Sequence, residues 1–307
     1  MQYESRQGFV WDFFFYLRYM DNSDEHCSKI RVAIQGEQGC YHELAARQYF
    51  EGKEVEIVPS QTFQTLFEAL ASDSHLMGIM AIENTIAGNL LQNHELLRNS
   101  QRVVIGEHRL HISHVLCALP GQKIEDINEV NSHPIALMQC KVFLDTMPGV
   151  KIVEVDDTAG AARTIANQKL MGHAAICSEY AANLYGLEIL ARAIETNKRN
   201  FTRFLILQDK FDDLMVDRNK INKASLVFSV RHIHGSLSKV LTIMSFYGIN
   251  LTKIQSMPII GREWEYRFFV DVTFDDYIVY RQALEAVRPF SNDFQVLGEY
   301  VENIELN

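Results

Sequence analysis

The feature that most constrains the fold is a regular alternation of short apolar strands with amphipathic helices, which runs from Arg31 to about residue 210. The run Arg31–Gln35 predicts the first strand, and the turn at 36–39 ends it. Residues 62–71 are typical of the helices, because their apolar side chains recur at the spacing of one helical face (Phe63, Leu66, Phe67 and Leu70). Strands that alternate with helices through short loops indicate an α/β fold with a largely parallel sheet.

Residues 224–307 follow a different plan. Strands are predicted at 224–230, 250–257, 266–272 and 294–300. One helix is expected to open at Gly235–Ser236 and end at Gly248, and a second to cover 275–287. The resulting order, βαββαβ, is the ferredoxin-like plan. The polar residues 212–223 predict a linker, and residues 1–30 are expected to form an N-terminal extension outside the main fold.

Composition excludes several classes of protein. The formal net charge of −10 argues against a nucleic-acid-binding protein, since such proteins concentrate Lys and Arg. No segment approaches the ~20 apolar residues that a membrane-spanning helix needs, so no membrane partner is expected. The five cysteines are odd in number and form no C-x-x-C pair, which favours reduced thiols in a cytoplasmic protein.

Common cofactor and catalytic motifs are absent from the sequence. It contains no G-x-G-x-x-G, P-loop, G-x-S-x-G or H-E-x-x-H element. The three histidines of His108-x-x-His111-x-x-His114 would alternate between the two faces of a strand, which prevents convergent metal ligation. We therefore expect neither a cofactor nor a metal site.

Polar clusters stand where predicted strands lead into helices, at 39–42, 83–88, 132–134, 157–159 and 200–204. In open α/β sheets, ligands bind outside the carboxyl ends of the strands. Helix N-termini at that edge offer free N–H groups to an anion. The alternative is that Ser132, Asp157 and Thr158 only cap helices. These clusters predict an anion-binding cleft without naming the anion.

The clusters resemble the signatures of one family, the prephenate dehydratases. Asn200-Phe201-Thr202-Arg203-Phe204 resembles its N-x-T-R-F element, and Glu83-Asn84-Thr85-x-x-Gly88 its E-N-S/T-x-x-G element. Ser132-His133-Pro134-x-Ala136-Leu137-x-Gln139-Cys140 resembles S-H-P-x-A-L-x-Q-C, and Gln35-Gly36-x-x-Gly39-x-Tyr41 resembles the glycine-rich opening. The match covers residues 31 to about 210 in the family's order. In departures from the pattern, His42 and Asp157 stand where the family usually has serine, and Ala81 where it usually has proline.

The resemblance implies a decarboxylating dehydration of prephenate to phenylpyruvate in phenylalanine biosynthesis, which needs no cofactor because aromatisation drives it. It implies three catalytic residues: Thr202, which would hydrogen-bond the departing hydroxyl, Arg203, which could clamp a carboxylate, and Phe204, which would cover the ring. Strand alternation favours Thr202 and Phe204 in the cleft and leaves an inward Arg203 as the alternative. The substrate would be bound by Gly39, Tyr41, Asn84, Thr85, Gly88, Ser132, His133, Thr158 and Ala159.

The family's architecture is a two-lobed, periplasmic-binding-protein-like catalytic domain, here 31–211. One lobe would span about 31–105 plus 203–208 and the other 106–195, followed by the linker and an ACT regulatory domain at 224–307. The resemblance implies a phenylalanine site at a subunit interface (Gly235, Ser236, Leu237, Asn250 and Leu251), and a homodimer or homotetramer. Gln255 and Met257 replace the family's usual glutamate and arginine. With only 30 residues before Arg31, we expect a monofunctional enzyme. An arogenate dehydratase and a non-catalytic amino-acid sensor are the alternatives.

Overall fold

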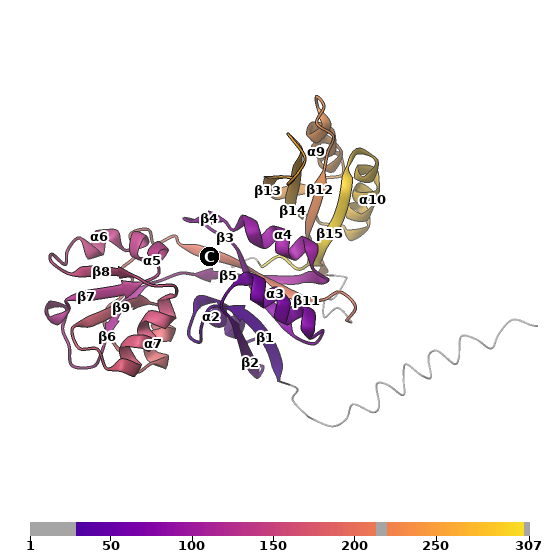
Figure 1. The fold of residues 1–307 in the computed structure, drawn as a ribbon. Coiled ribbons are helices and arrows are strands. Elements are labelled where there is room, and N and C mark those ends of the chain that lie inside the picture. Colours follow the sequence, from indigo (N-terminus) through magenta and orange to yellow (C-terminus); the bar gives the residue numbers. More distant parts are fainter. Residues whose placement is uncertain (1–28, 213–219, 304–307) are drawn as a thin grey trace, which may run out of the picture.

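The computed structural model describes residues 29–212 and 220–303, and Figure 1 shows them as two lobes followed by a C-terminal domain. Residues 1–28 of the predicted extension and 213–219 of the predicted linker lie outside the described residues. Within the described residues, no helix is both long and apolar enough to cross a membrane. The α/β class and the two-lobed arrangement predicted from the sequence are confirmed.

The first lobe is built on five strands in the order β5-β11-β3-β1-β2. β1 pairs in parallel with β2 and β3, whereas β11 returns from the second lobe and pairs antiparallel with β3 and β5. The strands are β1 (Ile30–Gln35), β2 (Val55–Ser60), β3 (Met77–Asn84), β5 (Arg102–His111) and β11 (Phe201–Asp209), with the two-residue β4 (Gly88–Asn89) beside β3. The helices are α2 (Tyr41–Tyr49), α3 (Phe63–Ser72) and α4 (Leu91–Asn99).

The second lobe has its own five-stranded sheet in the order β10-β6-β9-β7-β8. Its strands are β6 (Val115–Ala118), β7 (Glu129–Ser132), β8 (Lys151–Glu154), β9 (His173–Cys177) and β10 (Glu188–Ala191). Its helices are α5 (Pro134–Gln139), α6 (Lys141–Leu144), α7 (Thr158–Gln168) and α8 (Glu179–Leu184). The single helix predicted over 135–144 is divided at Cys140, which has φ −99° and ψ 12°.

Strands β5 and β11 connect the lobes (Figure 1). The sequence predicted separate strands at 103–105 and 110–118, but β5 continues through Glu107–Arg109 and is paired with β11 along this length. Charged residues interrupt its apolar pattern there because Glu107 has ionic partners inside the protein. The N-x-T-R-F segment therefore lies at the start of β11, where the chain crosses back from the second lobe to the first.

The C-terminal domain has the predicted βαββαβ order. It comprises β12 (Lys223–Ser229), α9 (Ser236–Phe246), β13 (Asn250–Pro258), β14 (Tyr266–Thr273), α10 (Tyr277–Val287) and β15 (Asn292–Tyr300), with the sheet order β13-β14-β12-β15. Helices α9 and α10 pack their apolar faces on this sheet around Phe228, Val240 and Tyr280.

The two domains share one sheet, which the sequence did not indicate. β15 pairs with β5 in parallel at a single point, Gly298 against Val104, and so joins the C-terminal strands to the first lobe. A Cβ added at Gly298 would lie 2.1 Å from the Val104 carbonyl oxygen. Only glycine permits this approach of the two backbones.

Candidate active site

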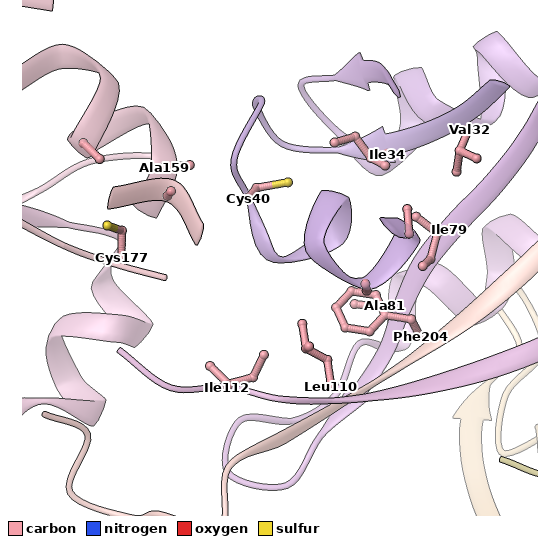
Figure 2. Packing of buried hydrophobic residues seen from close by; sticks show 14 of the residues in the cluster. Val32, Ile34, Cys40, Ile79, Ala81, Leu110, Ile112, Ala159, Cys177 and Phe204 are labelled. Carbon is pink, nitrogen blue, oxygen red and sulfur yellow. The ribbon is translucent and has the colours of Figure 1, made fainter. Parts of the chain in front are cut away.

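The cleft between the lobes encloses a cavity of about 310 Å³. One wall comes from the end of β3 and the start of β11 in the first lobe, and the opposite wall from the starts of α5 and α7 in the second. The predicted site residues that line it are Tyr41, Asn84, Gly88, His133, Thr158, Thr202 and Phe204. Figure 2 shows Phe204 beside Ala81 and near Leu110 and Ile112, all members of one buried apolar cluster.

Thr202 is held by Asn84, its partner in register on β3. The Asn84 Nδ2 lies 2.9 Å from the Thr202 Oγ1, which acts as the acceptor. The Asn84 Oδ1 accepts hydrogen bonds from the backbone N–H groups of Ile86 and Ala87, which fixes the orientation of the amide. The hydroxyl proton of Thr202 is therefore left to donate to a group in the cleft.

A chain of hydrogen bonds extends from this pair into the second lobe. Asn84 Nδ2 donates to Asn200 Oδ1 at 2.8 Å, and Asn200 Nδ2 donates to Gln139 Oε1 at 3.0 Å. The same oxygen lies 3.0 Å from His114 Nε2, and His114 Nδ1 lies 2.9 Å from the Tyr41 hydroxyl. Asn200, Gln139 and His114 were not predicted as site residues. Asn200 and Gln139 stood in the matched signatures, so that signal was available.

The floor of the cleft is largely apolar. Phe204 is 1% exposed, and its ring packs edge-on against His42 with the centroids 5.0 Å apart. Burial lowers the pKa of His42 to about 3, and its Nε2 accepts the backbone N–H of Ala81 at 3.2 Å. A histidine that is neutral and already hydrogen-bonded is a wall of the cleft rather than its acid.

Two helices of the second lobe point their N-termini at the cleft. His133 caps α5, its Nδ1 accepting the Ile135 N–H, and Asp157 caps α7 by accepting the Gly160 N–H at 2.8 Å. Asp157 also lines the cavity, and burial raises the pKa of its carboxyl group. Thr158 is the first residue of α7 and lies in the cleft. These N-termini supply partial positive charge for an anion.

Four residues predicted to bind substrate do not line the cavity, and each has a structural task instead. Gly39 has φ +93° and donates its N–H to the buried Glu43 carboxylate at 2.7 Å. Thr85 Oγ1 donates to the Arg199 carbonyl and accepts the Phe201 N–H, which anchors the start of β11. Ser132 is fully buried with its hydroxyl on the Ile176 carbonyl, and Ala159 is fully buried in the core.

The predicted catalytic role of Arg203 has to be corrected. Successive side chains of a strand point to opposite faces, and with Thr202 in the cleft Arg203 points away from it. Its side chain is 6% exposed and forms ion pairs with Glu83, Glu107 and Asp271. Arg203 does not line the cleft; it lines a different cavity of about 460 Å³, together with Glu83 and Arg109. The alternation argument from the sequence had already favoured this orientation.

The C-terminal domain carries a separate cavity of about 330 Å³. Three predicted effector-binding residues line it, together with three aromatic residues (Gly235, Ser236 and Leu237 with Trp264, Tyr266 and Phe268). Asn250 and Leu251 are not among its lining residues. Asn250 Nδ2 instead lies 3.3 Å from Thr273 Oγ1 on the neighbouring strand.

The cysteines and histidines of the described segments form no metal centre. Cys40, Cys117, Cys140 and Cys177 are free and buried, while Cys27 lies outside the described residues. Burial raises the pKa of Cys40, beside the cleft, to about 12. Within residues 29–212 and 220–303, no group of three or more His, Cys, Asp or Glu side chains could hold a metal ion.

Comparison with known proteins identifies the family. The family model for prephenate dehydratase matches residues 32–212. The chain is 37% identical to arogenate dehydratase/prephenate dehydratase 2, chloroplastic, of Arabidopsis thaliana over 89% of this chain and 73% of that protein. The crystal structure of prephenate dehydratase from Arthrobacter aurescens, in complex with L-Phe, is similar with a TM-score of 0.79 and 25% identity, covering 89% of this chain and 90% of that one.

A solved structure described as GqqA, a novel type of quorum quenching acylase, is also similar. Its TM-score is 0.79 at 30% identity, and the alignment covers 89% of this chain and 98% of that chain. The family match spans the whole two-lobed domain, and the curated relative extends it through most of the C-terminal domain. This chain belongs to the prephenate dehydratase family and is a lyase that performs the family's dehydration.

Proposed function

We propose that the cleft converts prephenate to phenylpyruvate with Thr202 as the hydrogen-bond donor to the departing ring hydroxyl. In this reaction the bond from the ring to its carboxylate breaks and releases carbon dioxide, and its electron pair completes the aromatic ring. The C–O bond to the hydroxyl breaks at the same time, and the departing hydroxyl, hydrogen-bonded by Thr202, takes up one proton from the solvent and leaves as water. The observation that carries the proposal is the Asn84–Thr202 hydrogen bond at the cleft wall, which orients one alcohol proton toward the substrate.

The rest of the cleft supports this chemistry. The N-termini of α5 and α7 direct partial positive charge toward the substrate's carboxylates. Phe204 and Ile112 give the departing carboxylate an apolar surrounding, which favours its loss as neutral carbon dioxide. The test is the appearance of phenylpyruvate absorbance on incubation with prephenate, and a purified enzyme that forms none would refute the proposal.

Arogenate is the second candidate substrate, and Asp157 is the observation that favours it. Arogenate carries an ammonium group where prephenate has a keto group. Among the described residues that line the cleft there is no lysine or arginine, and Asp157 contributes a carboxylate. A substrate ammonium would pair with this carboxylate, whereas the keto acid would face it unpaired. The ratio of kcat/KM values for arogenate and prephenate decides between them.

An acylase mechanism has less support from the same cleft. Acyl transfer to an alcohol needs a base in hydrogen-bond contact with it. The contact of Thr202 Oγ1 within the described cleft is with the Asn84 amide, which cannot accept a proton from it. The geometry therefore favours dehydration.

We further propose that the C-terminal domain is an ACT-type regulatory domain that binds phenylalanine. The cavity at Gly235–Leu237 has an aromatic rim and opens at the start of α9. Strand β13 is the edge of its sheet, and Ile254, Ile260 and Trp264 are exposed near it. An exposed apolar edge suits pairing with a second copy, so a homodimer or homotetramer would bring Asn250 and Leu251 to the site from the edge strand. The cytoplasm stays our predicted compartment; the Arabidopsis relative is named as chloroplastic.

A further inference from the structure

A buried cluster of charges lies where the catalytic domain meets the C-terminal domain. Glu83, Glu107 and Arg203 come from β3, β5 and β11, while Lys223, Lys253 and Asp271 come from β12, β13 and β14. Arg203, Glu107, Lys223 and Asp271 are all less than a tenth exposed. We name these six residues the interdomain charge cluster. Its three carboxylates balance its three cations.

Arg203 stands at the centre of the cluster and forms ion pairs with three carboxylates. Its Nε lies 2.8 Å from Glu83, its Nη1 lies 3.1 Å from Glu107, and its Nη2 pairs with Asp271 of the C-terminal domain. Asp271 is held in turn by the Ser225 hydroxyl at 2.6 Å. Burial alone would raise the pKa of Asp271, but the charge of Arg203 opposes it and the pKa is lowered. Asp271 is therefore a charged partner that β14 holds in place.

The two lysines of the cluster bind the strands β3 and β5 of the catalytic domain. Lys253 Nζ on β13 lies 3.0 Å from the second oxygen of Glu83. Lys223 Nζ bridges Glu107 at 2.9 Å and Glu302 at 3.2 Å, which ties β5 to the end of the C-terminal domain. All three strands that carry the cluster in the catalytic domain are thus bound to the C-terminal domain by ion pairs.

Each cluster residue on β3 and β11 is covalently next to a residue of the cleft. Arg203 pairs in register with Glu83, and the next pair along is Thr202 with Asn84. The four side chains therefore form two layers: Thr202 and Asn84 face the cleft, and Arg203 and Glu83 face the C-terminal domain. A shift of Arg203 toward or away from Asp271 moves the backbone that carries Thr202.

From this geometry we infer that Asp271 and Lys253 are positioning residues for the reaction, which act through Arg203 and Glu83 on Thr202 and Asn84. The arginine of the T-R-F signature then holds the threonine in place from behind rather than binding substrate. The inference rests on the proposed role of Thr202. Displacement of the Thr202 hydroxyl would strongly lower the reaction rate, since a shift of about 1 Å can reduce turnover roughly a hundredfold.

The test is a double-mutant cycle of Asp271→Asn with Thr202→Val in the full-length protein, assayed with prephenate. Asp271→Asn is expected to lower kcat about tenfold to a hundredfold and to leave KM within about twofold, because the cleft contacts that bind substrate stay in place. In the Thr202→Val background the same change is expected to leave kcat within about twofold. Asp275→Asn, the same change at an exposed carboxylate on the following turn, is the matched control and should match the unmodified enzyme.

Four outcomes decide the inference. An unchanged kcat in Asp271→Asn, or equal losses in both backgrounds, would overturn the inference while leaving the role of Thr202 intact. Normal turnover in Thr202→Val would overturn that role and the inference together. If Asp271→Asn is insoluble, Lys253→Gln at the less buried arm replaces it. For Lys253→Gln, as for Asp271→Asn, a loss of kcat that disappears in the Thr202→Val background supports the inference, and an unchanged kcat overturns it.

Discussion

Replacement of Thr202 by valine is the sharpest test of the proposed chemistry, because valine keeps the shape of threonine and removes only the hydroxyl. The loss of one preorganised hydrogen-bond donor to developing charge lowers kcat about a hundredfold to a thousandfold, or ~2.7–4 kcal/mol of transition-state stabilisation. The fold should lose much less. Asn84 Nδ2 has two N–H groups and keeps Asn200 Oδ1 at 2.8 Å and the Phe201 carbonyl at 3.2 Å as acceptors. The expected cost in unfolding free energy is therefore about 1 kcal/mol or less.

The measurements are steady-state formation of phenylpyruvate and urea denaturation of the same preparations. Thr164→Val on the exposed face of α7 is the control, since it removes a hydroxyl that donates to the Gly160 carbonyl within its own helix. Turnover within a few-fold of normal in Thr202→Val would refute the assignment. So would a loss of turnover matched by an equal loss in the control.

Three further results are expected. Asp157→Ser keeps a capping side chain on α7 but removes the charge, so kcat/KM for arogenate should fall about tenfold to a hundredfold relative to prephenate; an unchanged ratio would contradict the proposed pairing. Burial lowers the pKa of His42 to about 3 and that of His94 to about 4. The histidines of the unfolded chain titrate near pH 6.5. Between about pH 4 and pH 6.5 the unfolded chain therefore binds more protons than the folded one. The free energy of unfolding should fall below pH ~6.5 by up to ~1.4 kcal/mol per pH unit for each histidine, and equal values at pH 7 and pH 5 in urea titrations would argue against neutral buried histidines. Millimolar phenylalanine should raise the Tm and change kcat/KM, and Leu237→Ala should weaken both responses about tenfold; calorimetry that detects no binding would exclude the regulatory site.

The sequence predicted the layers of the fold well where an element was amphipathic and local. The helix at Phe63–Ser72 and the βαββαβ order of the C-terminal domain are confirmed, because one buried face imposes a clear period on the residues. Strand β5 was divided in the prediction, because Glu107 is a charged residue inside the protein, and only partners distant in sequence explain it. Helix α4 was missed, since its stripe contains the buried polar residues Asn93 and His94.

The site shows the same division between local and distant information. The signatures correctly brought Asn84, Thr202 and Phe204 to one cleft. They could not separate residues that touch the cleft from neighbours that support it, as Thr85 and Ser132 do through backbone hydrogen bonds. Strand alternation could make that separation, and for Arg203 it did.

The single close approach of Gly298 to Val104 limits how this enzyme can be rebuilt. A C-terminal domain grafted from another enzyme would need a residue without a side chain at that position, because any Cβ would collide with the carbonyl oxygen across the seam. The graft would also have to bring its own acid and its own lysines to neutralise the charges that the catalytic half buries there. The two domains are thus matched to each other at the seam, and the C-terminal cavity is easier to reshape in place than the whole domain is to exchange.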